Sequence, residues 1–518
     1  MIESAAMGHT PHLTRRQILT SIPVLTTGTL LAPLHGQKPD TSAPAIIRGS
    51  LRDPAGRPIA AKLRVTGSGT DEVYMPANAI RTMPDRRHYF YARGEYEVAV
   101  PAGRYRIEAV RGICHKPAVE FTEVGSGLRH QVDLTVHPLL DTKARGWYSG
   151  NTHTHYHLSI DENPDDRIRM VPPAEDLDVS VLSYLIRGDS PYITNRYTVG
   201  RLPQFSRDGV IMDMGEEARN NHTFGDFGYG HVLFLNIPRP IEPVSTGLLS
   251  KDGKAPDYPT LSTLCAQARE LGGLTVWCHN GSGLEAPVAA ALGLMDAYNV
   301  ADGLAADYGR YYRLLDCGLQ IPVSSGTDWW IYDHNRVFVQ VEGAFTYDTW
   351  IQGLRAGRTF VSNGPLIEFT AGGKGPGAVL QPGPRVKVAA RVLSRIPFDR
   401  VEIIHDGRVV ADQTSIEGRE ARLEREIEVE QGGWIAARVT GAARTYAGFP
   451  VFAHTSPIYF RVDGTPHRRA EAIGAFLDEI DASKRAIYKS FRFNGDAQRA
   501  LAVGKFDEGR KAFAKLLR

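Results

Sequence analysis

The sequence predicts a multidomain protein that combines an α/β domain with β-rich domains. Three observations lead to this prediction. The chain has 518 residues, which is too many for a single hydrophobic core. Apolar and polar residues alternate between turn signals in 43–140 and again in 373–463, as in β-sandwiches. In 146–364, between these two stretches, apolar strand-like runs alternate with helical patterns, as in an α/β barrel or sheet.

The first β-rich domain is expected at 43–140. In IIRGSLRDPAGRPIAAKLRV, the turn sequence D-P-A-G-R-P separates two alternating stretches. GEYEVAVPAGRYRIEAV repeats this design around a Pro-Ala-Gly turn. Regular turn signals between short alternating runs are typical of a small β-sandwich.

The central domain is expected at 146–364. Its predicted strands include DVSVLSYLI, HVLFLNI, LTVWCHN and IPVSSGTD, which are apolar throughout and become polar at one end. YPTLSTLCAQARELGG places apolar residues on one helical face and then stops at two glycines. Strands of this kind separated by helices indicate an α/β domain whose site lies at the strand ends.

Alternation returns in 373–463, where RVEIIHDGRVVADQ reads as a hairpin around Asp406-Gly407. A second β-sandwich is therefore expected there. The final stretch, 467–518, has two segments with apolar residues at helical spacing. Amphipathic helices at the end of a chain are most simply packing elements.

The stretch 1–36 has the pattern of an export signal. Arg15 and Arg16 precede a moderately apolar run that contains Thr, Ser, Gly and Pro23. This run is too short and too polar to span a membrane as a helix, and it resembles a twin-arginine signal, which exports folded proteins. We therefore expect a periplasmic or secreted protein. A disordered leader with a chance Arg-Arg pair is the alternative interpretation.

Composition excludes some partners and leaves others open. Lys plus Arg number 60 and Asp plus Glu number 58, which gives a formal net charge of +2. So small a charge gives no reason to expect nucleic acid as a partner, and no later segment predicts membrane insertion. The four cysteines have no C-x-x-C spacing. Buried thiols are expected, and a disulfide in an exported protein is the alternative. A small-molecule substrate remains as the expected partner, and the oligomeric state stays open.

Histidines and carboxylates at strand ends form the candidate site. GWYSGNTHTHYH carries His153 and His155 two residues apart, so both project from one side of a strand. Taken alone, this H-x-H pattern fits a metal site or a solvated strand face equally well. Further ligand-type residues stand at ends of the other predicted strands, and these are Glu216, Glu217, His231, His279 and Asp328. Their recurrence favours a metal site.

These stretches together resemble the polymerase-and-histidinol-phosphatase (PHP) superfamily of metallohydrolases, and within it the carbaryl-hydrolase-like group. GWYSGNTHTHYH is similar to the opening motif G-W-Y-S-G-D-x-H-x-H of that group. GEEARNN, GYGHVLFLN, YYRLLDCGLQIPVSSGTDWW and WIQGLRAGRTFVSNGPL are similar to its later motifs. The resemblance spans roughly residues 45 to 465, including the flanking β-domains. It implies a PHP-type central domain, which is a distorted β/α barrel.

The resemblance also implies the roles of individual residues. His153 and His155 would hold a first metal together with Glu217 and Asp328. His231 and His279 would complete a second metal, with Glu217 as the bridging carboxylate. Imidazoles and carboxylates suit zinc, manganese or iron, and a bridging carboxylate can hold two such ions. Glu216, beside the bridge, is expected to be a surface or supporting group.

Two departures from the superfamily pattern limit the expected number of metals. Trp330 stands where the superfamily often has a histidine, and VLSYLIRGD offers no Asp-His pair at its strand end. Both losses fall on a third site, so two divalent ions are expected. His157 is a possible ligand or substrate contact, or simply an exposed strand histidine. Trp330 and Arg336 are possible substrate contacts, although a pocket wall and a salt bridge are the simpler interpretations.

The resulting hypothesis is an exported dinuclear metallohydrolase. A hydroxide that bridges the two metals would attack an ester-like centre, with a carboxylic or carbamic ester favoured as the substrate. One alternative is a phosphoesterase of the same superfamily. The other is a binding protein in which the metals only stabilise the fold. The sequence does not identify the metal, the exact substrate or the role of the flanking β-domains.

Overall fold

The computed structural model describes residues 43–83, 86–156, 163–188, 192–223, 226–331, 334–462 and 464–518. The predicted leader, 1–36, and His157 lie outside these described residues. From residue 43 onward the chain clusters into one unit. None of its described helices is long and apolar enough to cross a membrane.

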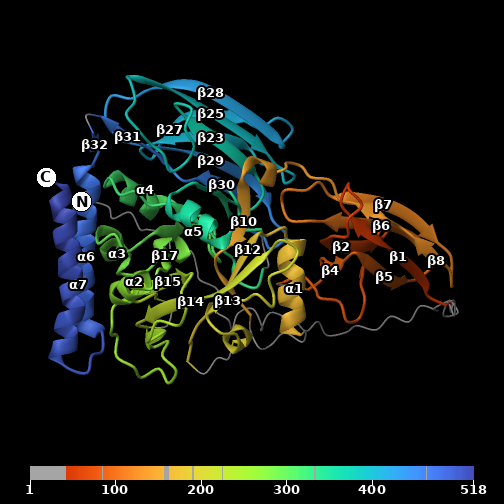
Figure 1. The fold of residues 1–518 in the computed structure, drawn as a ribbon, viewed down its shortest axis with the longest axis horizontal. Coiled ribbons are helices and arrows are strands. Elements are labelled where there is room, and N and C mark those ends of the chain that lie inside the picture. Colours follow the sequence, from red (N-terminus) through yellow and green to blue (C-terminus); the bar gives the residue numbers. More distant parts are fainter. Residues whose placement is uncertain are drawn as a thin grey trace, which may run out of the picture. The chain divides into compact units, whose positions relative to one another are not determined.

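The N-terminal region forms one sheet of nine strands, most of which pair antiparallel (Figure 1). Alternate residues of its strands are buried; in β5, for example, Tyr96, Val98 and Val100 point inward. The strands are β1 (Ala45–Arg52), β2 (Ala60–Gly67), β3 (Val73–Tyr74), β4 (Phe90–Arg93), β5 (Glu95–Val100), β6 (Gly103–Val110), β7 (Ala118–Val124), β8 (Arg129–Gln131) and β9 (Leu134–Thr135).

The central region contributes thirteen short strands, and most of them are buried on both faces. Eleven of them belong to a large mixed sheet, whereas β11 and β20 pair only with each other. The strands are β10 (Trp147–Asn151), β11 (Thr154–His155), β12 (Val179–Tyr184), β13 (Gly200–Arg201), β14 (Ile211–Asn221), β15 (Gly230–Leu235), β16 (Ser245–Gly247), β17 (Leu274–Trp277), β18 (Ala297–Asn299), β19 (Val323–Ser324), β20 (Asp328–Trp329), β21 (Arg336–Gln340) and β22 (Thr359–Ser362).

Five α-helices lie between these central strands, and each buries an apolar face. In the second of them, Leu261, Leu264 and Ala268 are buried, and the chain leaves the helix at Gly272 with a positive φ. The helices are α1 (Pro164–Ala174), α2 (Leu261–Glu270), α3 (Ala286–Ala291), α4 (Gly309–Asp316) and α5 (Tyr347–Arg355), with 3₁₀ turns η1 (Lys143–Arg145), η2 (Ile193–Arg196) and η3 (His279–Gly281).

The C-terminal β-region extends the central sheet. β22 pairs antiparallel with β30, so the large sheet runs on from the central strands without interruption. Only β23, β25 and β28 form a separate sheet. The strands are β23 (Leu366–Ala371), β24 (Val379–Leu380), β25 (Arg385–Leu393), β26 (Arg400–His405), β27 (Arg408–Thr414), β28 (Glu420–Glu428), β29 (Gly433–Arg444), β30 (Pro450–Thr455), β31 (Ile458–Val462) and β32 (Thr465–Pro466).

The predicted fold class, with a central β/α barrel between β-sandwiches, is wrong. A β/α barrel needs parallel strands that are each followed by a helix. Here β14 and β15, β15 and β17, and β10 and β21 pair antiparallel. The described part of the chain instead has an 18-stranded mixed sheet, which joins the central strands to the C-terminal ones. Periodicity reports whether a strand is buried, and it does not report the direction of the neighbouring strand.

Two long helices close the chain, α6 (Ala470–Ser490) and α7 (Asp496–Leu516), and they lie side by side (Figure 1). Ile473, Phe476 and Ile480 of α6 are fully buried, and the Phe476 ring stacks on the ring of Phe513 in α7. α7 also packs on α3, where Gly509 leaves space for Val288. These helices therefore cover the central region through an apolar seam.

A buried ion pair connects the N-terminal sheet to the central region. The ammonium group of Lys62 in β2 lies 2.7 Å from Oε1 of Glu175, which follows α1, and both side chains are almost fully buried. Tyr91 of β4 also donates a hydrogen bond to Oε1 of Glu175. Burial lowers the pKa of Lys62 to about 8, even though the charge of Glu175 opposes the change. The lysine therefore stays charged at neutral pH because Glu175 is beside it.

Candidate metal centre

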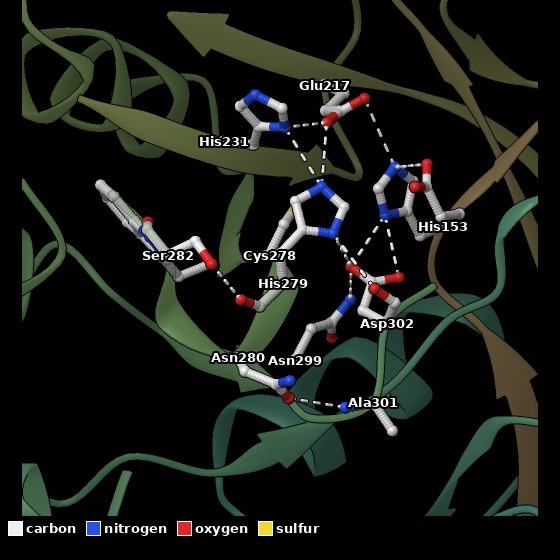
Figure 2. A network of polar contacts seen from close by, with 12 residues as sticks. His153, Glu217, His231, Cys278, His279, Asn280, Ser282, Asn299, Ala301 and Asp302 are labelled. Carbon is white, nitrogen blue, oxygen red and sulfur yellow. Dashed lines mark hydrogen bonds and ion pairs between the residues drawn. The ribbon is translucent and has the colours of Figure 1, made fainter. Parts of the chain in front are cut away.

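The six predicted metal ligands converge in the central region. They form two groups whose potential ligand atoms lie within 4.8 Å of one another. Glu217 belongs to both groups, and Figure 2 shows its carboxylate between His153 on one side and His231 and His279 on the other. The first group is His153, His155, Glu217 and Asp328, and the second is Glu217, His231 and His279.

The strand β14 supplies the shared carboxylate. Side chains alternate along a strand, so Glu217, Arg219 and Asn221 share one face while Glu216 points to the other. The two carboxylate oxygens of Glu217 divide between the groups. Oε2 lies 2.9 Å from Nε2 of His155, and Oε1 lies 3.0 Å from Nδ1 of His231. One side chain is thus placed to bridge two ions.

The short strands β11 and β20 assemble the first group. They pair in parallel, with Thr154 opposite Asp328 and His155 opposite Trp329. This pairing brings Oδ1 of Asp328 to 3.5 Å from Nε2 of His153 and 3.7 Å from Nε2 of His155. The pairing of β11 with β20 therefore brings together ligands that are far apart in the sequence.

The second group uses a hairpin and a neighbouring strand. His231 in β15 stands opposite Arg219 of β14 in the antiparallel register. β17 pairs with the other side of β15 and ends at Trp277, just before His279. As a result Nε2 of His279 lies 3.1 Å from Nδ1 of His231. Two ligands of this group thus come from adjacent strands, and the third, His279, begins the 3₁₀ turn η3 that follows the next strand.

The backbone around these ligands is strained. His279, Asn280, Ala301 and Asp328 all have φ between 52° and 64°, a region that residues other than glycine seldom adopt. Such conformations persist only where the surroundings impose them, and they cluster at functional sites. Space is also tight, because a Cβ on Gly326 would lie only 2.5 Å from the Cβ of His153. Glycine at this position lets the two chain segments approach.

Hydrogen bonds fix the outer nitrogen of each histidine as a donor. Nδ1 of His155 lies 3.0 Å from the carbonyl oxygen of Ser183, and Nδ1 of His279 lies 3.1 Å from the carbonyl oxygen of Asp302. Nδ1 of His153 meets the Asp302 carboxylate at 2.9 Å. Carbonyl and carboxylate oxygens can only accept, so each of these nitrogens carries the hydrogen.

The fourth histidine, His231, also donates from its outer nitrogen, but in this residue the outer nitrogen is Nε2 and not Nδ1. Nε2 of His231 lies 2.7 Å from Oδ1 of Asn221. The amide nitrogen of Asn221 donates to the carbonyl of Asp226, which fixes the amide orientation. Nε2 of His231 is therefore the donor, and its Nδ1 is left as a lone pair that faces Glu217.

With all four histidines neutral, the lone pairs of their inner nitrogens consequently converge with no imidazole hydrogen between them. Nε2 of His153 and Nε2 of His155 are 2.8 Å apart, and each is an acceptor once its Nδ1 carries the hydrogen. Oε1 of Glu217 is buried and accepts no hydrogen bond within the described part of the chain. Acceptors that face one another repel unless a cation lies between them. The donor set, neutral imidazoles with carboxylates, is the one that divalent transition metals bind.

The pKa of His153 indicates an excess of negative charge around the ligands. Burial alone would lower the pKa of His153, but the charges of Asp302, Glu217 and Asp328 raise it well above its ordinary value. Burial would raise the pKa of Glu217, yet Arg219 and His153 hold it well below its ordinary value. Without a metal, the centre thus attracts a proton. A bound cation would replace that proton.

Three supporting residues were not predicted from the sequence. Asp302 holds His153 through its carboxylate and His279 through its carbonyl, so it orients one ligand in each group (Figure 2). Asn221 orients His231, and Arg219 lies 3.2 Å from Oε2 of Glu217. The alternation along β14 from Glu217 is a signal that could have identified Asn221 and Arg219. Asp302, in a loop after β18, had no comparable signal.

Cys278 lies behind His153, in a third grouping with His153 and Asp302. Burial raises the pKa of its thiol, although the charge of His153 opposes the change. The thiol therefore stays protonated, and thiols bind metals as thiolates. We therefore interpret Cys278 as a buried neighbour of His153 and not as a metal ligand.

The remaining predicted residues are placed in different ways. His157 lies outside the described residues. Trp330 is half-buried, and its backbone nitrogen donates to the carbonyl of His155. Arg336 is fully buried, and its guanidinium donates to the carbonyl of Glu175. Its Nη2 also lies 3.7 Å from Oε2 of Glu175, so a salt bridge, the simpler interpretation, describes its surroundings.

Glu216 is not a surface group. It is fully buried on the face of β14 opposite Glu217, where its Oε2 accepts a hydrogen bond from the backbone of Ile241. Burial raises its pKa to about 8. Glu216 is therefore mostly protonated at neutral pH.

Replacing Asp302 with alanine tests its supporting role. The variant removes the carboxylate that orients His153 but keeps the backbone carbonyl that orients His279. Loss of such a partner typically weakens metal binding by roughly 10- to 100-fold. We expect this loss for one ion only, measured by competition with a chromogenic chelator. Equal weakening of both ions, or of neither, would contradict the assigned role.

Comparisons with known proteins add little to this picture. No family model and no curated protein matches the chain. Among solved structures, the Bacillus anthracis TIE protein is 8% identical with a TM-score of 0.14, and the match covers 81% of this chain and 50% of that one. An engineered protein is 13% identical with a TM-score of 0.16, over 58% of this chain and 52% of the other. The chain thus spans about half the length of each, and such scores carry no argument about fold or function.

Proposed function

We propose that this protein is an exported metal-dependent hydrolase that cleaves an ester-like bond. It would hold two divalent ions, zinc, manganese or iron, with Glu217 between them. The observation that carries the proposal is the convergence of carboxylates with imidazole lone pairs, because the hydrogen bonds of the outer nitrogens leave no hydrogen on the inner nitrogens of the neutral histidines. The motif resemblance to carbaryl-hydrolase-like PHP metallohydrolases supports the same activity. The export signal is part of the proposal and rests on the Arg15-Arg16 pattern alone.

The residues of such a site would have different roles, some as metal ligands and others in orienting those ligands. Two bound ions would lower the pKa of a water molecule and stabilise charge on the leaving oxygen. His153, His155 and Asp328 would hold one ion, and His231 and His279 the other. Asp302 and Asn221 keep the histidine tautomers fixed before any substrate arrives. Such fixed orientation lets the site act without rearrangement during the reaction.

One side of the centre is more open than the rest. Asp328 retains 16% of its side-chain exposure, whereas His153, His155 and Glu217 have none. The rings of Tyr192 and Trp329 stack on each other, and both lie within 6 Å of the His155 ring. Phe227 lies beside His231 and His279. These rings place apolar surface beside the ligands and would exclude water from the neighbourhood of a bound substrate.

Hydrolysis that depends on bound metal is the test of this proposal. The metal-depleted protein, prepared with a chelator, should be inactive on chromogenic carboxylic esters, carbamates and phosphoesters. Activity should return with added zinc, manganese or iron and reach its maximum at two ions per chain. Activity that survives complete metal removal would exclude the mechanism. A protein that binds two ions but hydrolyses none of these compounds would favour the binding-protein alternative.

A further inference from the structure

Arg219 is the one strongly basic side chain that contacts both ligand groups within the described residues. It lies on the same face of β14 as Glu217 and is 6% exposed. Nη1 is 3.2 Å from Oε2 of Glu217, and Nη2 is 3.5 Å from Nδ1 of His231. Its Nε has no hydrogen-bond partner within the described residues. The guanidinium is therefore incompletely satisfied even before any ion binds.

The atoms that Arg219 contacts are the same lone pairs that two ions would need. Oε2 of Glu217 also faces His153 and His155, and Nδ1 of His231 also faces His279. A lone pair that is shared with an ion is a poor acceptor for a guanidinium. With the ions bound, Nη2 of Arg219 would lose its contact with Nδ1 of His231, whose single lone pair would go to an ion. Because Nε also has no partner within the described residues, these two donors would need another acceptor close to the centre.

Charge points in the same direction. Two divalent ions and Arg219 would carry five positive charges, because a guanidinium stays protonated in proteins. The carboxylates within the centre, Glu217, Asp302 and Asp328, carry three negative charges. The hydroxide of the proposed mechanism would neutralise one of the two surplus positive charges. The one that remains in a buried site calls for an anionic group on the substrate.

We propose that Arg219 binds a negatively charged group of the substrate beside the scissile bond. The substrate would then be an anionic ester, either a phosphoester or a carboxylic ester that bears a carboxylate. This inference rests on the proposed hydrolase function and narrows its substrate class. Arg219 is the specificity-determining residue, because the planar guanidinium fork matches an oxyanion with two hydrogen bonds.

Binding of inorganic phosphate to the metal-loaded protein tests this inference without relying on turnover. Calorimetry should show phosphate affinity falling by roughly 10- to 100-fold in Arg219→Gln, as expected for lost charge-assisted hydrogen bonds, with two ions per chain retained. Arg219→Lys keeps the charge but loses the fork, so an intermediate affinity is expected. Arg201→Gln is the matched control, since Arg201 pairs with Asp348 at the surface; its phosphate affinity should be that of the unmodified protein.

Metal analysis accompanies each variant. If Arg219→Gln fails to hold both ions, Arg219→Lys decides, and its phosphate affinity must still fall relative to the unmodified protein. Unchanged phosphate affinity in a fully metallated Arg219 variant would overturn the inference.

Paired substrates then separate this inference from the proposed function. The experiment has three arms, each with one substrate, and all three substrates release the same leaving group. They are a phosphodiester, an ester that carries a carboxylate, and a neutral ester. Arg219→Gln should raise KM for whichever anionic arm the protein hydrolyses and leave the neutral arm nearly unchanged. Equal effects on charged and neutral arms would refute the role of Arg219 while the hydrolase function stands. Arg219-dependent phosphate binding without any hydrolysis would refute the function and leave the anion site in place.

Discussion

Replacing Glu217 with alanine is expected to release both metal ions and abolish hydrolysis. Each carboxylate oxygen faces a different group, so the single substitution removes a ligand from both. Metal binding supplies several kcal/mol of transition-state stabilisation. The rate should therefore fall by about 1000-fold or more. Elemental analysis after gel filtration, together with kcat/KM on the best substrate, measures both effects.

The neighbouring residue offers a matched control within the same strand. Glu216→Gln is nearly isosteric, and the native side chain is mostly neutral at neutral pH because burial raises its pKa to about 8. The glutamine oxygen can still accept from the backbone of Ile241. Metal content and activity should stay close to those of the unmodified protein. Equal metal loss from both variants would show that the bridging residue has been misassigned.

The second large effect concerns stability. Lys62→Met is expected to lower the free energy of unfolding by about 3–5 kcal/mol, the range found when one partner of a buried ion pair is removed. Glu175 would remain buried beside Tyr91 and Arg336 without its closest cation. Urea unfolding followed by circular dichroism measures the change. Metal content should be unaffected, because neither residue belongs to the ligand groups.

A surface lysine provides the comparison for this experiment. Nζ of Lys387 in β25 lies 2.8 Å from Oε2 of Glu424 in β28, two residues from its register partner, and both side chains are about two-thirds exposed. Water screens such a pair, and holding it together costs side-chain entropy. Lys387→Met should therefore unfold at the same urea concentration as the unmodified protein. A similar loss in both variants would mean that burial of Lys62 is not what makes its pair important.

The metal ligands could be predicted because each combines a suitable residue type with a strand end. His153 and His155 show the two-residue spacing of one strand face, and Asp328 ends an apolar run. Asp302 could not be found in this way. Its role depends on the loop that turns its carboxylate toward His153 and its carbonyl toward His279. An orienting role of this kind depends on three-dimensional geometry and leaves little trace in residue spacing.

Strand positions were easier to predict than their arrangement. The stretch HVLFLNI contains all of β15 except its first residue, Gly230, and LTVWCHN contains β17, as their apolar runs indicated. Both are buried on two faces, which is usual for parallel strands in a barrel. The two strands nevertheless pair antiparallel with each other. Pairing direction depends on contacts between strands, so the barrel prediction failed although its strands were found.

The register between β11 and β20 has a consequence for how the protein is made. His155 and the residue after Asp328 are neighbours in space, but nearly the whole central region is translated between them. A ribosome has to complete that region before the first ligand group can exist, and β22 then awaits β30, which lies still further along. Until β20 has been translated, the nascent chain therefore has no complete first ligand group that could bind a metal ion. Metal uptake at the first ligand group would therefore follow the synthesis and folding of most of the central region.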